Sequence, residues 1–139
     1  MKLNKQGNLV SIDGGYNRSC TNISYDNQNR VYYFVDKSAQ YQISYESDQV
    51  QCVTVNFGNT IGKQGGQFSY EYNEHGDVKR ILYSPNPNRR YYIEVLKTEA
   101  VDKVYSFEYI YDEHGNWTKR ITLIDGKYES MTLRIISYY

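Results

Sequence analysis

Two Glu-His-Gly turns contain the only histidines of the chain, His75 and His114. A carboxylate beside an imidazole can act in acid-base catalysis or help to hold a metal, if two such turns lie within a few ångströms of each other. In an antiparallel meander, strands at 78–83, 91–96 and 104–111 would lie between the two turns. An odd number of intervening strands places the two turns at opposite ends of the sheet. We therefore expect solvent-exposed turn histidines, no catalytic residue and no metal site.

Three pairs of adjacent basic residues could contact a nucleic acid: Lys79-Arg80, Arg89-Arg90 and Lys119-Arg120. Aromatic residues near them would suit a single-stranded ligand. Adjacent residues on a strand point to opposite faces, however, so each pair is split rather than gathered into a patch. The 16 basic and 16 acidic side chains also cancel. We therefore expect no nucleic-acid partner.

Aromatic residues at alternate positions near the same turns are the best candidates for a binding site. Tyr70 and Tyr72 precede the first turn, whereas Tyr109, Tyr111 and Trp117 flank the second. Such rings stack on sugars or anchor a protein partner. Packing across neighbouring strands would explain the same rows without any ligand. We predict that a ligand, if there is one, is a protein or a carbohydrate and contacts these five residues.

No other pattern indicates catalysis or a cofactor. The chain has no Gly-x-Ser-x-Gly motif, and its glycine-rich segment at 58–67 lacks the Gly-Lys-Ser/Thr ending of a phosphate-binding loop. Cys20 and Cys52 do not have the spacing of metal ligands, and we expect both to be buried free thiols. The sequence thus predicts that the protein is not an enzyme and has no cofactor.

The elements that must position these residues are short strands joined by polar turns. Alternation with a period of two places Phe107, Tyr109 and Tyr111 on one face, whereas helical periodicity is never sustained. Asp125-Gly126 predicts a two-residue hairpin, and Asn29 stands where other turns have glycine. About eleven or twelve strands predict an all-β antiparallel meander of repeated hairpins, as an open curved sheet or an up-and-down barrel.

The composition and the remaining loop and turn signals agree with the predicted all-β fold. The 139 residues suit one domain. The 17 tyrosines suit strands of which neither face is fully dry, because tyrosine has an apolar body and a polar tip. Residues 58–67 predict a surface loop. Residues 84–88, with two prolines, predict a turn or an edge.

Two of the hairpins share a recognisable motif. Residues 109–117, YIYDEHGNW, resemble the tyrosine-aspartate (YD) repeat of bacterial Rhs proteins and of the related animal teneurins. Residues 70–78, YEYNEHGDV, are similar, with asparagine in place of the aspartate. Three earlier segments, at 3–12, 23–34 and 43–55, keep part of the pattern. The resemblance covers most of the chain weakly and one third of it well.

The resemblance implies repeated hairpins without a catalytic role. In that family the repeats build a hollow β shell that encloses a toxin or anchors extracellular modules. This chain has few and irregularly spaced units, so we expect a single YD-repeat-like domain over 1–139 rather than a closed shell. We expect a non-catalytic structural or ligand-binding module, bacterial, and exported or associated with the cell envelope. The N-terminus shows no signal peptide and no segment predicts a transmembrane helix. An intracellular immunity or toxin-associated binding protein is the alternative.

Overall fold

The computed structural model describes residues 2–3, 5, 9–13, 19–36, 39–57, 65–86 and 101–138. All regular secondary structure in these ranges is β-strand. No helix within them has the length and hydropathy needed to cross a membrane. The strands are β1 (Lys2–Leu3), β2 (Leu9–Asp13), β3 (Ser19–Tyr25), β4 (Val31–Asp36), β5 (Ala39–Glu46), β6 (Gln49–Phe57), β7 (Gly66–Tyr72), β8 (Val78–Pro85), β9 (Lys103–Tyr111), β10 (Trp117–Ile124) and β11 (Lys127–Leu133).

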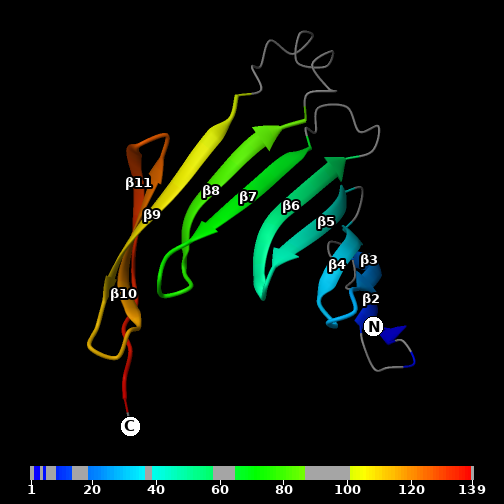
Figure 1. The fold of residues 1–139 in the computed structure, drawn as a ribbon, viewed down its shortest axis with the longest axis horizontal. Helices are drawn as coiled ribbons and strands as arrows, with labels where there is room; N and C mark the ends of the chain where they lie inside the picture. Colours follow the sequence, from blue (N-terminus) through cyan, green and yellow to red (C-terminus); the bar gives the residue numbers. More distant parts are fainter. Residues whose placement is uncertain are drawn as a thin grey trace. The chain divides into compact units, whose positions relative to one another are not determined.

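The strands follow one another in the sheet in the order of the sequence (Figure 1). Pairing is antiparallel throughout, as between β5 and β6 and between β9 and β10. The strand order begins at β1 and ends at β11, so the hydrogen-bonded sheet is open and is not closed into a barrel. The predicted all-β antiparallel meander is confirmed, and of the two arrangements left by the sequence the open one is present.

The backbone contacts divide the chain into two compact units. Unit 1 comprises Met1–Gln67 and Pro85–Ala100, and unit 2 comprises Phe68–Ser84 and Val101–Tyr139. Strands β1 to β6 belong to unit 1. Strands β9 to β11, with β7 from Phe68 onward and β8 up to Ser84, belong to unit 2. The expectation of one repeat domain over the whole chain stays a prediction.

Unit 1 is held together by pairs of side chains across strands rather than by a dry core. Ala39 and Val55 are the only buried hydrophobic residues in the described part of the chain, with 4% and 7% of their surface exposed. Phe34 and Tyr41 face each other across β4 and β5, with stacked ring centroids 4.5 Å apart. Such pairs are the main source of packing energy in a sheet whose faces are partly wet. The expectation that neither face is fully dry is confirmed.

The two cysteines of unit 1 are free, as predicted. Cys20 lies on β3 and Cys52 on β6, with β4 and β5 between them. Both are half-buried, so the expectation of buried thiols was wrong in degree. Side chains on both faces of this sheet are partly exposed to water, so a thiol on either face is not fully buried.

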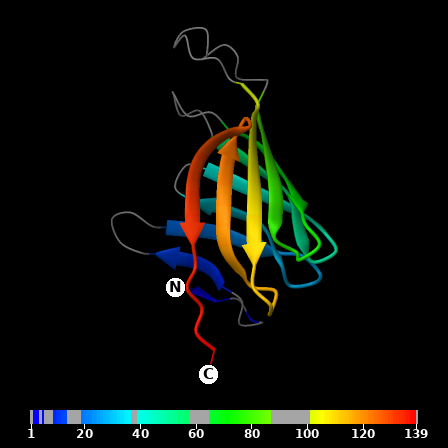
Figure 2. The ribbon, with the colours of Figure 1, turned by 90° about the vertical axis from the view of Figure 1, so that its left-hand side faces the viewer.

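Unit 2 has β9 and β10 side by side, with β11 next to them (Figure 2). Trp117 pairs with Tyr111, and Arg120 pairs with Tyr109. The register shifts between Trp117 and Lys119, so Thr118 is one residue more than the partner strand supplies. This bulge brings Trp117 and Arg120 to the same face although they are three positions apart, because paired residues project to the same side of a sheet.

The turns have the backbone geometry that the sequence predicts. Gly76 and Gly115 have φ values of 81° and 77°, and Asn29, at the corresponding place in unit 1, has a φ of 64°. Asp125 and Gly126 both have positive φ, at 50° and 76°, as a two-residue hairpin of the I′ type requires. Asparagine tolerates this region better than other residues with a side chain, which explains why it can replace glycine here.

Several predicted boundaries need correction. β8 extends through Pro85 rather than ending before the proline-rich segment, as proline is tolerated at the end of a strand. β7 begins at Gly66, inside the predicted loop. The sequence pattern predicts a last strand over 131–138, whereas β11 spans Lys127–Leu133. Much of the predicted loop and the predicted strand at 91–96 lie outside the described residues.

Position 115 offers a direct test of the turn geometry. A Cβ atom at Gly115 would meet no heavy atom within 4 Å, so any cost of substitution comes from the backbone and not from a clash. We expect Gly115→Val to lower the free energy of unfolding by about 1 to 3 kcal/mol. Gly115→Asn should cost much less, because Asn29 already adopts this conformation. Urea unfolding of both variants measures the difference, and equal losses would contradict the assigned conformation.

Candidate binding site

Each Glu-His-Gly turn is closed by the side chain of its first residue. The Oδ1 atom of Asp112 accepts hydrogen bonds from the backbone N–H groups of His114 at 3.0 Å and Asn116 at 2.9 Å. Aspartate and asparagine favour such turns because their short side chains reach the backbone two to four residues ahead. In the other Glu-His-Gly turn, the Oδ1 atom of Asn73 accepts from the backbone N–H groups of His75 and Asp77. In a turn of unit 1, the Oδ1 atom of Asp26 accepts from those of Gln28 and Arg30.

A tyrosine from the end of β9 joins the two ends of the turn between β7 and β8. The Tyr111 hydroxyl donates to the Asp77 carboxylate at 2.8 Å and accepts from the Asn73 amide at 2.7 Å. The His75 ring stacks on the Tyr111 ring with centroids 4.0 Å apart. Burial, followed by the hydrogen bond to Asp77, raises the pKa of Tyr111. We call Asn73, His75, Asp77 and Tyr111 the first turn network.

A second turn network repeats this arrangement with Asp112, His114, Asn116 and Tyr138. The Tyr138 hydroxyl donates to the Asp112 carboxylate and accepts from the Asn116 amide at 2.8 Å. The His114 and Tyr138 ring centroids are 4.4 Å apart. In the first network the amide comes first in the turn and the acid last, whereas in the second network the acid comes first and the amide last. A hydroxyl both donates and accepts, so either order satisfies it.

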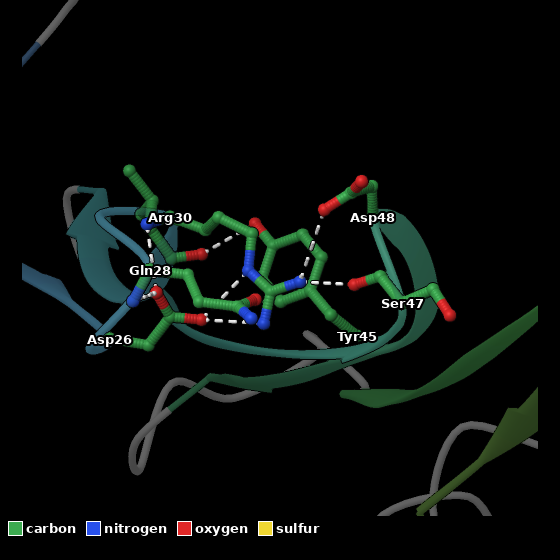
Figure 3. A network of polar contacts seen from close by, with 7 residues as sticks. Asp26, Gln28, Arg30, Tyr45, Ser47 and Asp48 are labelled. Atoms are coloured by element: carbon green, nitrogen blue, oxygen red, sulfur yellow. Dashed lines mark hydrogen bonds and ion pairs between the residues drawn. The ribbon is translucent and has the colours of Figure 1, made fainter.

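Unit 1 contains a related contact in which an arginine, at the turn position of Asp77 and Asn116, lies over a tyrosine ring (Figure 3). Arg30 forms an ion pair with Asp26 at 2.9 Å, and its guanidinium lies 4.4 Å from the centroid of the Tyr45 ring. The same guanidinium donates to the carbonyl oxygen of Ser47. The Tyr45 hydroxyl donates to the Val31 carbonyl at 2.7 Å. Arginine thus links one turn to the next, as a tyrosine does in unit 2.

The two histidine turns lie at the same end of unit 2, contrary to the prediction. Only β8 and β9 separate them, because β8 pairs directly with β9. The error came from counting a strand at 91–96 between them. Tyr111, next to the second turn, consequently reaches the first. The prediction that both histidines are exposed is confirmed.

Metal ligands are not gathered at these turns. His75 and His114 each approach the glutamate of their own turn, at 3.8 and 3.7 Å. Within the described ranges, no group of three or more histidine, cysteine or acidic side chains could hold a metal ion.

Three of the five residues predicted to contact a ligand come together on one face of unit 2. The ring centroids of Tyr109 and Tyr111 are 5.8 Å apart, and those of Tyr109 and Trp117 are 6.2 Å apart. All three are half-buried. The Tyr109 hydroxyl donates to the Val78 carbonyl at 2.8 Å, and burial raises the pKa of this tyrosine. The hydroxyls of the two tyrosines therefore form hydrogen bonds within unit 2, and the rings of all three residues lie on the surface of the sheet.

The other two predicted residues lie on β7. Tyr70 and Tyr72 are half-buried and engaged in contacts of their own. Their contact with a ligand stays a prediction, as it does for Tyr109, Tyr111 and Trp117.

Sequence reasoning missed two arginines at this surface. The Arg134 guanidinium carbon lies 3.7 Å from the Trp117 ring centroid, and that of Arg120 lies 5.7 Å from the same centroid. Arg120 also lies 5.5 Å from the ring of Phe107. The Nε atom of Arg120 is buried without a hydrogen-bond partner. We call Phe107, Tyr109, Tyr111, Trp117 and Arg120, with Arg134, the aromatic face.

The sequence held only part of the signal for these arginines. The strand pattern separated Lys119 from Arg120, and the register places them on opposite faces, with Lys119 beside Ile110 and Arg120 beside Tyr109. The bulge at Thr118 and the position of Arg134 beyond the end of β11 could not be predicted from the pattern.

Comparison of the chain with protein-family models and with curated proteins finds no match. The resemblance of residues 109–117 and 70–78 to the YD repeat therefore stays a prediction.

The first turn network should contribute measurably to stability. Tyr111→Phe removes the hydroxyl that joins Asp77 and Asn73, and we expect the free energy of unfolding to fall by about 1 kcal/mol, the usual contribution of a partly exposed hydrogen bond. Tyr32→Phe is the control, because Tyr32 is exposed and its hydroxyl has no hydrogen bond within the described ranges. Urea unfolding compares them. Equal stability of the two variants would exclude a stabilising role for the network.

The second turn network should appear in the titration of Asp112. The Tyr138 hydroxyl, followed by backbone N–H groups, holds the pKa of Asp112 below its usual 3.8. The resulting stability is complete above pH 3.8 and is lost as the pH falls through the lower pKa of the folded state. Tyr138→Phe should move the titration upwards, toward 3.8. Side-chain carboxyl NMR measures this shift, and an unchanged pKa in the variant would refute the hydrogen bond as its main cause.

Proposed function

We propose that the chain is a non-catalytic ligand-binding β-repeat module of the YD-repeat type, secreted or at a bacterial cell surface. The observation that supports it best is the aromatic face, where Trp117 and two tyrosine rings lie with Arg120 and Arg134 on one side of unit 2. Aromatic residues and arginine are the types that contribute most to binding energy at interfaces. Their ligand is a protein or a carbohydrate.

The turn networks favour a structural role for the repeats themselves. In unit 2 the carboxylates of Asp77 and Asp112 are bonded to tyrosine hydroxyls and turn amides. Groups held in this way serve to position strands. They give the aromatic face a rigid support, which lowers the entropy lost when a ligand binds.

The chemistry of the aromatic face indicates what the ligand must offer. A guanidinium stacked on an indole keeps its N–H edge available for carboxylate or hydroxyl oxygens. Arg134 is exposed and forms no ion pair with an acidic side chain in the part of the chain that the structure describes, whereas the Nε atom of Arg120 is buried. A ligand that combines an apolar face with acceptor oxygens matches both features.

The test uses defined panels of glycans and of purified candidate proteins, with binding measured by titration calorimetry. We expect Trp117→Ala and Arg134→Ala each to weaken binding roughly tenfold or more. Tyr32→Ala is the control, because Tyr32 is an exposed tyrosine on β4, in unit 1. Circular dichroism checks that each variant folds, and Arg134 is exposed enough for its removal to leave the sheet intact.

Two outcomes would redirect the proposal. Binding that survives both substitutions but is lost in His75→Ala or His114→Ala would move the site to the turns and reopen an enzymatic role. Binding restricted to cytoplasmic toxins would instead support an intracellular immunity or toxin-associated protein.

A further inference from the structure

Unit 2 has a second, opposite face that is apolar and exposed. The register places Ile110, Lys119 and Leu133 in one row across β9, β10 and β11. The next two rows pair Ile121 with Met131 and Leu123 with Tyr128. On β8, Leu82 pairs with Val104 of β9 and projects to the same face. We call the large exposed residues among these the apolar face; their exposed fractions are Leu82 36%, Ile110 54%, Tyr128 67%, Met131 47% and Leu133 66%.

These side chains form a continuous surface rather than scattered exceptions. Neighbours within a row lie on strands about 4.8 Å apart, and successive rows are two residues, or about 7 Å, apart along the strands, so large side chains in neighbouring rows are within reach of each other. Together they expose on the order of 500 Å² of apolar surface, since a fully exposed large side chain offers roughly 150 to 250 Å². Single exposed apolar residues are common, but a contiguous patch of this size usually marks an interaction surface.

Two charges within the apolar face indicate what covers it. Lys119 lies between Ile110 and Leu133, and Glu108 pairs with Ile121 in the adjacent row. Arg80 lies on the same face, beside Ser106, and is already paired with Glu71 at 3.4 Å. Lys119 and Glu108 form no ion pair within the described ranges. A twofold rotation can bring the unpaired lysine of each copy to the unpaired glutamate of the other, so the face is complementary to itself.

We propose that the apolar face is the interface of a symmetric homodimer of this chain. A stable interface buries about 800 Å² per partner, of which roughly 56 to 65% is apolar. The required apolar area, about 450 to 520 Å², agrees with that of the face. The aromatic face lies on the other side of the same strands, so dimerisation leaves it open and provides two copies of it.

The full chain is tested by sedimentation equilibrium over a range of concentrations. The wild type should be a dimer. Met131→Glu and Leu133→Glu should each weaken dimerisation roughly 100-fold, because they place a carboxylate in the apolar contact. Tyr32→Glu is the matched control: it adds the same charge at an exposed apolar residue of unit 1, and it should leave the dimer unchanged.

A charge exchange tests the orientation of the two copies. Glu108→Lys and Lys119→Glu should each weaken the dimer, whereas the double variant should restore it, because the exchanged charges again meet across the twofold axis. A wild type that stays monomeric overturns the proposal. A dimer that persists in both glutamate variants, or an open-ended oligomer, overturns it as well.

Discussion

The bond between a tyrosine hydroxyl and the two ends of a neighbouring turn is the contact on which unit 2 depends. The described part of the chain has almost no fully buried side chain, so a dry core cannot supply most of the stability. Hydrogen bonds at the turns and ring contacts across strands take over this role. Tyrosine meets both needs, because its ring packs against a neighbour while its hydroxyl closes a turn. The abundance of this residue follows from that constraint.

The turn networks show which features of the repeat are required and which can vary. Tyr111 follows Asn73 by 38 positions, and Tyr138 follows Asp112 by 26, yet both hydroxyls reach an amide and a carboxylate. Acid and amide exchange places between the two networks without loss of a bond. The two turn networks therefore share a geometry of strands and turns rather than a spacing along the sequence. In unit 1 the guanidinium of Arg30 performs the corresponding task.

The alternation of side chains along β9 and β10 divides unit 2 into two surfaces of different chemistry. One surface holds half-buried rings with Arg120, and the other holds exposed aliphatic residues with Lys119. A bulge of one residue at Thr118 decides that Trp117 joins the first surface. The proposed ligand site and the proposed dimer interface thus share the same strands without competing for the same side chains.

The sequence by itself determined the elements and their local chemistry. It predicted the all-β meander, the turn geometry at Asn29 and at Asp125-Gly126 and the separation of Lys119 from Arg120, because each depends on patterns within a few positions. Only the tertiary structure decided that the two histidine turns share one end of unit 2, that Tyr111 closes the first of them and that Arg134 stacks on Trp117. These contacts join residues far apart in the chain, and they depend on the number of intervening strands and on their register. A local pattern cannot specify either quantity, since one strand more or fewer reverses the end at which a turn lies, and one bulge changes the face on which a side chain projects.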